Sequence, residues 1–164
     1  MSINLNNVKT QIKSILDTAN TTTASRDLSS GMTRRVQRVF KTNVERIPIQ
    51  GSLIPAVTIF MDSKDIEQAT IARTQAGAVR KGLLSVKVAG MIFNPLFQSV
   101  DADPADEDLE NLMENIEEIL RGNSSINSLA TWSIPTEVTY HSGIVEEETH
   151  FRVGIMNLDL TVFY

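Results

Sequence analysis

DADPADEDLENLMENIEEILRG, residues 101–122, carries a helix start, an apolar stripe and a helix stop. Asp103 is an N-cap residue followed by Pro104 at the first helical position, and acidic side chains fill the first turn, where the helix dipole favours negative charge. Apolar side chains recur at steps of three and four residues: Leu109, Leu112, Met113, Ile116, Ile119 and Leu120. Arg121 and Gly122 supply a cation and a C′ glycine at the end. The stretch predicts one amphipathic helix with a buried face.

Residues 132–164 predict two alternating strands behind this helix. In the first strand, one even-numbered face carries Trp132, Ile134, Val138 and Tyr140. In the second, apolar residues stand at odd positions up to Ile155 and at even positions from Met156 onward. A β-bulge near Ile155 would bring both sets onto one face. The alternative is a strand whose two ends meet different partners, one of them another subunit.

The first hundred residues add a helix, two strands and a basic segment. Apolar spacing predicts a helix over residues 4–18, and residues 55–60 and 81–93 have strand patterns. Residues 63–81 fit neither period. Residues 20–30 are rich in serine and threonine, which indicates a loop, and residues 31–50 form either a short helix or an extended arm.

The order helix, strand, strand, helix, strand, strand predicts an α+β fold. Such a fold has a mostly antiparallel sheet with the helices packed on one face. A length of 164 residues is typical of one domain. We therefore expect residues 1–164 to form a single domain with a flexible basic arm or loop at about 20–50.

The net charge of −5 hides an uneven distribution along the chain. Residues 1–100 hold 13 Lys and Arg against 6 Asp and Glu, whereas residues 101–164 hold 2 against 14. A compact domain with one basic and one acidic portion can bind its own copies head to tail, and such contacts close into rings. The other interpretation is that both sets of charges only solvate their own surfaces.

The sequence carries no pattern for catalysis, for a cofactor or for a metal. It has no cysteine, no phosphate-binding glycine loop and no serine-nucleophile motif. His141 and His150 flank the predicted hairpin and could share a metal with Glu146–Glu148, but exposed histidines beside carboxylates are commoner than metal sites. No apolar run is long enough to span a membrane, and the first residues lack the apolar core of a secretory signal, which predicts a cytoplasm-like compartment.

Two charged groups are the candidate subunit or partner interface. The basic group is Arg34, Arg35, Arg38, Lys41 and Arg46, and the acidic group is Asp106, Glu107, Glu110 and Glu114. One interpretation of the basic group is a salt-sensitive contact with DNA phosphates. The other is a basic arm that docks on the acidic helix of a neighbouring copy. The low aromatic content of 5%, without a known DNA-binding motif, favours the arm.

Three stretches together resemble the tail terminators of long-tailed phages, the minor tail protein U family. They are KGLLSVKVAGMIF (81–93), DADPADEDLENLMENIEEIL (101–120), and the strand pair TWSIPTEVTYHSG (131–143) with FRVGIMNLDLTVFY (151–164). The resemblance is one of pattern and element order, and it spans about two-thirds of the chain. The basic stretch at 21–50 is longer than the resemblance leads us to expect.

The resemblance implies a small α+β virion protein, assembled in the host cytoplasm, that forms a hexameric ring at the head-proximal end of the tail. Its implied partners are further copies of itself, the tail tube protein and a neck or head-completion protein, with the sheath protein as a further candidate. DNA would pass through the lumen without sequence recognition, and no membrane or catalytic residue is involved. A neck or head–tail connector is the alternative within this class. A DNA-binding protein that uses residues 34–46 is the alternative outside it.

Overall fold

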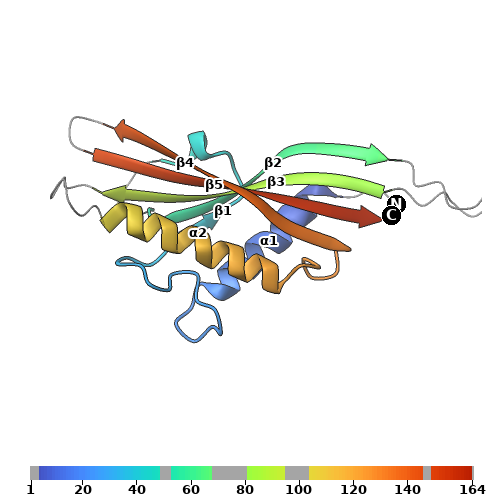
Figure 1. Ribbon diagram of the computed structural model, residues 1–164, viewed down its shortest axis with the longest axis horizontal. Helices are drawn as coiled ribbons and strands as arrows, with labels where there is room; N and C mark the ends of the chain where they lie inside the picture. The colour runs from blue at the N-terminus through green and yellow to red at the C-terminus, as the bar shows by residue number, and fades with distance from the viewer. Residues whose placement is uncertain (1–3, 49–52, 68–80, 95–103, 146–148, 164) are drawn as a thin grey trace, which may run out of the picture.

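The computed structural model describes residues 4–48, 53–67, 81–94, 104–145 and 149–163 (Figure 1). Its elements are α1 (Leu5–Ala19), β1 (Arg38–Phe40), the 3-10 turn η1 (Val44–Arg46), β2 (Ala56–Glu67), β3 (Lys81–Asn94), α2 (Pro104–Gly122), β4 (Trp132–Val145) and β5 (Thr149–Phe163). The predicted helix at 4–18 and the strand at 81–93 are confirmed. The ambiguous stretch 63–81 begins as the end of β2, and most of it lies outside the described residues.

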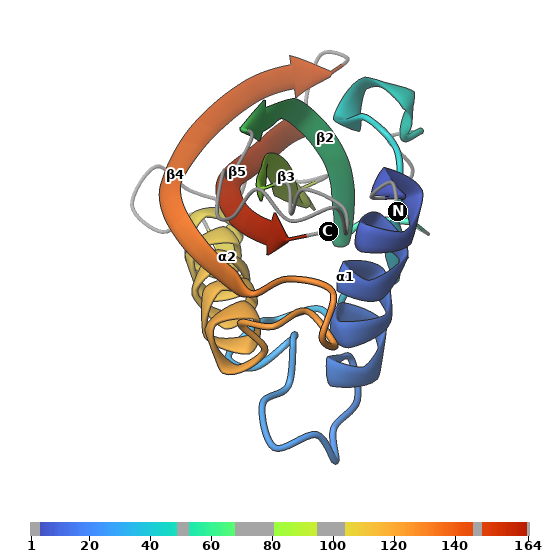
Figure 2. The ribbon, with the colours of Figure 1, turned by 90° about the vertical axis from the view of Figure 1, so that its right-hand side faces the viewer.

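The strands form one sheet in the order β1-β2-β3-β5-β4. β1 runs parallel to β2, and the other three pairings are antiparallel. Figure 2 shows both helices on the same side of a curved sheet. The helix α1 contacts β1 and β2, while α2 contacts β3, β5 and β4. The α+β class and the mostly antiparallel sheet are therefore confirmed, with the short edge strand β1 as an addition.

The apolar stripe of α2 is buried as predicted. Leu112, Ile116 and Leu120 are fully buried in the main core between the helices and the sheet. Its expected N-cap Asp103 lies outside the described residues. At the other end Gly122 still belongs to the helix and does not adopt the left-handed conformation of a C′ glycine, so that prediction is wrong. Asn123 caps this end instead, because its side-chain amide donates to the carbonyl of Ile119 at 2.8 Å.

The last strand contains no bulge, which corrects the first expectation for β5. Its register with β3 is continuous from Lys81–Phe163 to Asn94–His150. The odd residues around Val153 join a second, smaller apolar cluster with Ile47, Ile54 and Met91 on the face away from the helices. The even residues from Met156 onward join the main core. The two ends of β5 thus meet different partners, both from this chain, and a contact with another subunit stays a prediction.

A bulge lies instead in β4, between Pro135 and Glu137. Before it Trp132 pairs with Thr161, on the face away from the helices, and after it Tyr140 pairs with Gly154, on the helix face. The predicted single even-numbered face of β4 is therefore wrong. A period-2 pattern cannot show the extra residue, because both halves alternate correctly by themselves.

Candidate functional site

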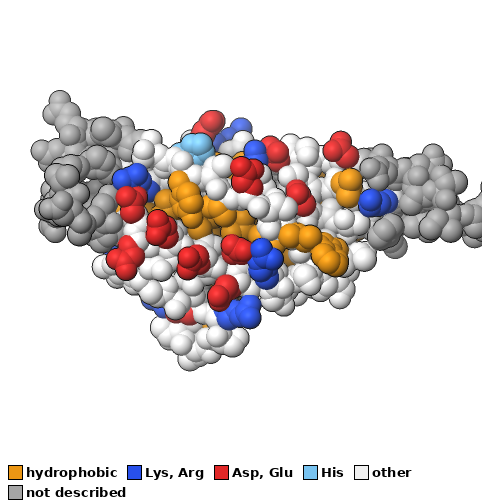
Figure 3. All heavy atoms as spheres, in the orientation of Figure 1, with side chains coloured by type: hydrophobic (Ala, Val, Ile, Leu, Met, Phe, Trp, Pro, Cys, Tyr) orange, Lys and Arg blue, Asp and Glu red, His pale blue; other side chains and the backbone are white. Residues whose placement is uncertain are grey.

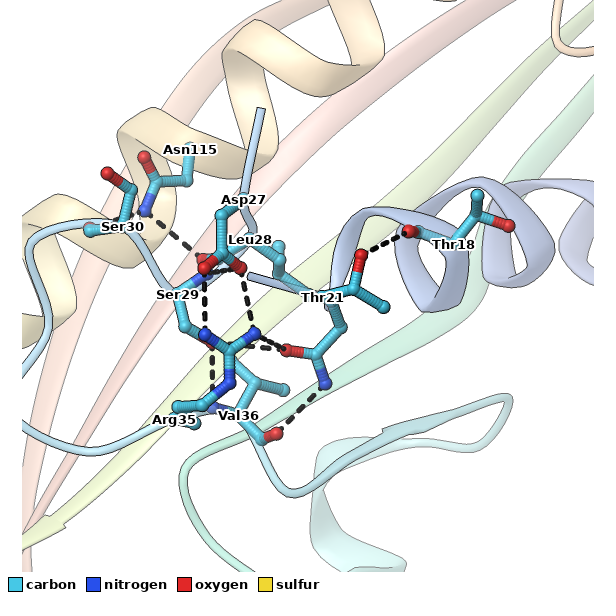
Figure 4. Close-up of polar contacts among 10 residues, drawn as sticks. Thr18, Thr21, Asp27, Leu28, Ser29, Ser30, Arg35, Val36 and Asn115 are labelled. Carbon is cyan, nitrogen blue, oxygen red and sulfur yellow. Dashed lines mark hydrogen bonds and ion pairs between the residues drawn. The ribbon is translucent and has the colours of Figure 1, made fainter. Parts of the chain in front are cut away.

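The basic segment begins with a loop that an ion pair holds in place. Arg35 donates from both terminal nitrogens to the two carboxylate oxygens of Asp27, at 2.7 and 2.9 Å (Figure 4). These hydrogen bonds, stronger than the opposing effect of burial, hold the pKa of Asp27 below its usual value. Ser29 adds a hydrogen bond from the backbone N–H of Val36 at 3.0 Å. Arg35, a predicted interface residue, is thus engaged within its own loop.

The same loop lies against α2 of its own chain. The side-chain amide of Asn115 donates to the carbonyls of Leu28 at 3.1 Å and Ser30 at 2.8 Å (Figure 4), and Asp108 accepts from the backbone N–H of Thr33 at 2.7 Å. Leu28 is fully buried beneath these contacts. The expectation was an arm docked on the acidic helix of a neighbouring copy, whereas these residues dock on α2 within the chain. The sequence signal was the pair of polar residues Asp108 and Asn115 beside the apolar stripe.

The rest of the basic segment is neither one helix nor an extended arm, but a strand and a 3-10 turn. Arg38 is exposed on the edge strand β1, and its guanidinium lies 5.5 Å from the centre of the Phe40 ring. Lys41 donates to the hydroxyl of Thr10 at 2.9 Å, while Arg34 and Arg46 are exposed. Arg38, Lys41 and Arg46 therefore lie on or just after β1, whereas Arg34 and Arg35 stand in the loop that lies against α2. The five basic candidates do not share one helix.

The acidic candidates belong to α2, and Figure 3 shows acidic side chains gathered over this helix. Asp106 forms an ion pair with Arg152 of β5 at 3.1 Å. Glu107, Glu110 and Glu114 are exposed, and none of them forms an ion pair within the described part of the chain. Since β1 and β4 are opposite edges of the sheet and α2 contacts β3, β5 and β4, Arg38 on β1 lies toward the opposite edge from the acidic residues of α2. Arg34 and Arg35 are not separated from α2 in this way, because their loop lies against it.

Two exposed aromatic residues on β4 were missed as candidates. Trp132 is 59% exposed and Tyr140 is 54% exposed, and they are the large hydrophobic side chains that the described residues leave exposed. Figure 3 shows a band of hydrophobic side chains across this face of the molecule. The sequence pattern assigned both to a buried strand face, because alternation alone does not distinguish an edge strand from a central one. Pro135 within the strand was the available signal, since proline is confined to edges and bulges.

Tyr140 borders a cavity of about 280 Å³ between β4 and α2. The cavity is lined by Asp106, Leu109, Glu110, Tyr140, His141, Ser142 and Arg152. Burial raises the pKa of the Tyr140 phenol, and the negative charges of Glu110, Glu114 and Glu117 raise it further. The phenol therefore stays protonated at neutral pH and can donate a hydrogen bond.

A larger open cavity of about 630 Å³ lies between the C-terminal ends of α1 and α2. Serine, threonine and asparagine side chains line it together with Arg26, and no carboxylate or imidazole is among its lining residues. It offers no general acid or base of the usual kinds.

The two histidines are not opposite each other in the hairpin. His141 pairs in register with Val153, and His150 pairs with Ile144, so the two histidines are not cross-strand partners. In the described part of the chain, no group of three or more histidine, aspartate or glutamate side chains could hold a metal ion. Among the same residues no helix is long and apolar enough to cross a membrane.

No family model matches the chain, and no curated protein matches it significantly.

Proposed function

We propose that this chain is a structural virion protein, a tail terminator whose copies form a ring of six that caps the tail tube and joins the tail to the head or neck. The observation that carries the proposal is the placement of opposite charges at opposite edges of one sheet. Arg38 is exposed at the β1 edge, and Glu110 and Glu114 are exposed beside β4. Two different surfaces that attract each other make a head-to-tail contact, and such contacts repeat until the ring closes.

In this role the chain acts by assembly and not by catalysis, and it uses no metal or cofactor. Its partners are other copies, the tail tube protein and a neck or head-completion protein. DNA passes through the lumen and is not recognised by sequence. The resemblance to the minor tail protein U family in three stretches supports this role, as does the element order of the fold.

The first experiment is light scattering on the purified chain at low and moderate salt, with electron microscopy of the same sample. We expect a mass about six times the 18.2 kDa of one chain, and ring-shaped particles. Single chains at every concentration that also fail to bind purified tails would contradict the proposal. Binding to a neck component in place of the tail tube would favour a connector.

A DNA-binding protein is the second candidate, favoured by the exposed Arg34, Arg38 and Arg46. It predicts tight binding to duplex DNA that weakens steeply as salt rises, since released counterions drive such binding. The double variant Arg38→Ala/Arg46→Ala should then abolish binding. Arg35 is unsuitable for this test, because its loss also removes the ion pair to Asp27. A terminator binds DNA weakly, with or without these substitutions.

A further inference from the structure

The edge strand β4 presents a surface that this chain does not cover. Its outer side has no strand partner among the described residues, and the exposed Tyr140 ring lies against Gly154 on the helix face. Exposed strand edges and aromatic surfaces commonly bind a partner. The question is which partner fits here, and by which contacts.

Addition of a partner strand along β4 is disfavoured. Pro135 has no N–H to donate, and the bulge after it breaks the regular spacing of the edge. Both features are ways in which natural proteins block edge-to-edge pairing. We therefore look to side chains, more than to backbone hydrogen bonds, for the contact.

The side chains around Tyr140 have the chemistry of a site for a cation. An exposed aromatic ring attracts a guanidinium over its face, and the nearby carboxylates of Glu110 and Glu114 are not ion-paired within the described residues. Arg152 also lines the cavity, but it already forms an ion pair with Asp106. The remaining local charge is negative, and the cavity of about 280 Å³ has room for one side chain.

We propose that this cavity receives Arg38 from a second copy of the chain, an inference that rests on the proposed function. Arg38 is exposed at the opposite edge of the same sheet and already lies over the Phe40 ring. In the contact its guanidinium is held between Phe40 of its own chain and Tyr140 of the next, with Glu110 as the counter-ion. Arginine is suited to such a position because its planar group stacks on rings and still donates to carboxylates.

The geometry of the contact follows from the two faces of the sheet. Arg38 pairs with Ala56 on the face away from the helices, and Tyr140 points to the helix face. Successive copies therefore overlap at their sheet edges. The outer face of the β1 edge of one copy lies against the helix-side face of the β4 edge of the next. This arrangement agrees with a β4 edge on which strand addition is disfavoured around Pro135.

Two single charge reversals test the contact. Arg38→Glu reverses the charge of the inserted side chain and leaves the cavity intact. Glu110→Arg reverses a charge in the cavity and leaves the inserted side chain intact. Each variant alone should associate at least tenfold more weakly than the unmodified chain, measured by sedimentation velocity at low salt. An equal mixture of the two should associate again, because every contact in an alternating chain then joins opposite charges.

Three controls make the result specific. Glu137→Arg makes the same change of charge as Glu110→Arg, but on β4, the strand that carries Tyr140. Glu137 pairs with Asn157 on the other face, so association should persist. Tyr140→Ala should weaken association without unfolding the chain, as checked by circular dichroism. Arg46→Glu alone should associate like the unmodified chain, because Arg38 and Glu110 are both intact in it.

The possible outcomes separate this inference from the proposed function. If the unmodified chain forms rings and both reversals also form rings, the contact is overturned and the terminator role stands. If Arg46→Glu alone loses association while Arg38→Glu alone keeps it, the assignment of Arg38 is overturned. If the unmodified chain stays monomeric up to its solubility limit, the contact is overturned, and binding to purified tails decides the proposed function separately.

Discussion

Gly90 and Gly154 face each other across β3 and β5, and Met113 of α2 lies over both. A Cβ atom at Gly154 would lie 2.7 Å from Met113 Cγ, and one at Gly90 would lie 2.9 Å from Met113 Sδ. Both distances are shorter than real Cβ contacts allow. The paired glycines therefore set how closely α2 approaches the sheet.

The variant Gly154→Ala should reduce the free energy of unfolding by about 1–3 kcal/mol, because the added methyl group overpacks the core. Urea denaturation followed by circular dichroism measures the loss. The double variant Gly154→Ala/Met113→Ala is the control, since shortening Met113 removes the clash. We expect its loss to be smaller than the sum of the two single losses. Strictly additive losses would show that the two side chains do not meet.

Leu112→Asp or Ile116→Asp should unfold the chain, because each places an unpaired charge in the main core. The expected loss is about 4 kcal/mol or more, which is comparable to the total stability of many domains. Glu118→Asp, at an exposed position of the same helix, should leave unfolding nearly unchanged. A Leu112→Asp chain that keeps its far-ultraviolet circular dichroism and loses only assembly would make the stripe an interface, in conflict with the fold.

Thr58→Val should destabilise the attachment of the segment after β1. Thr58 is fully buried, and its hydroxyl donates to the carbonyl of Thr42 and accepts from the Thr42 N–H at 3.4 Å. Valine keeps the shape but leaves these backbone groups unpaired, at a cost of about 1–3 kcal/mol. Thr139→Val is the matched control, since its exposed hydroxyl makes only a long hydrogen bond of 3.5 Å to Ile155. Equal effects of the two substitutions on the urea midpoint would refute the assignment.

Protonation of Asp27 should account for part of the loss of folding stability in acid. Arg35 lowers the pKa of Asp27 in the folded chain, so the folded state binds this proton less readily than the unfolded state does. The stabilisation is complete above the unfolded pKa of about 3.9, and it is lost as the pH falls through the lower folded value. Asp27→Asn should therefore lower stability at pH 7 and reduce the loss below pH 4. Glu107→Gln, an exposed carboxylate without an ion pair among the described residues, should leave the acid profile unchanged.

The sequence was sufficient for the elements whose burial is regular. The stripe of α2 and the alternation of β3 were predicted correctly, because each packs one whole face on the main core. The start of α1 at the predicted position is also explained locally. The Asn4 side chain caps the helix by accepting from the N–H groups of Asn6 at 3.0 Å and Asn7 at 3.2 Å. In these places local pattern and tertiary packing agree.

The failures come from contacts between residues far apart in the chain. The shift from odd to even positions in β5 resembled a bulge, because the pattern does not show that residues near Ile47 and Ile54 cover the other face of the sheet. Gly122 resembled a helix stop, yet its missing side chain leaves room for Arg26, whose Nη1 would lie 3.0 Å from a Cβ there. Arg35 resembled a free cation, because its partner Asp27 lies eight residues earlier in a loop without periodicity.

The two apolar clusters on opposite faces of the sheet share their central strands. β3 gives Val88 to one cluster and Met91 to the other, and β5 gives Met156 and Val153 in the same way. A local opening that exposes one cluster breaks the hydrogen bonds between β3 and β5, and these also hold the other cluster together. The two clusters therefore cannot unfold separately. Amide hydrogens of β3 and β5 should accordingly exchange with solvent only on global unfolding, as one cooperative unit, whereas those of the three-residue strand β1 exchange through local fraying.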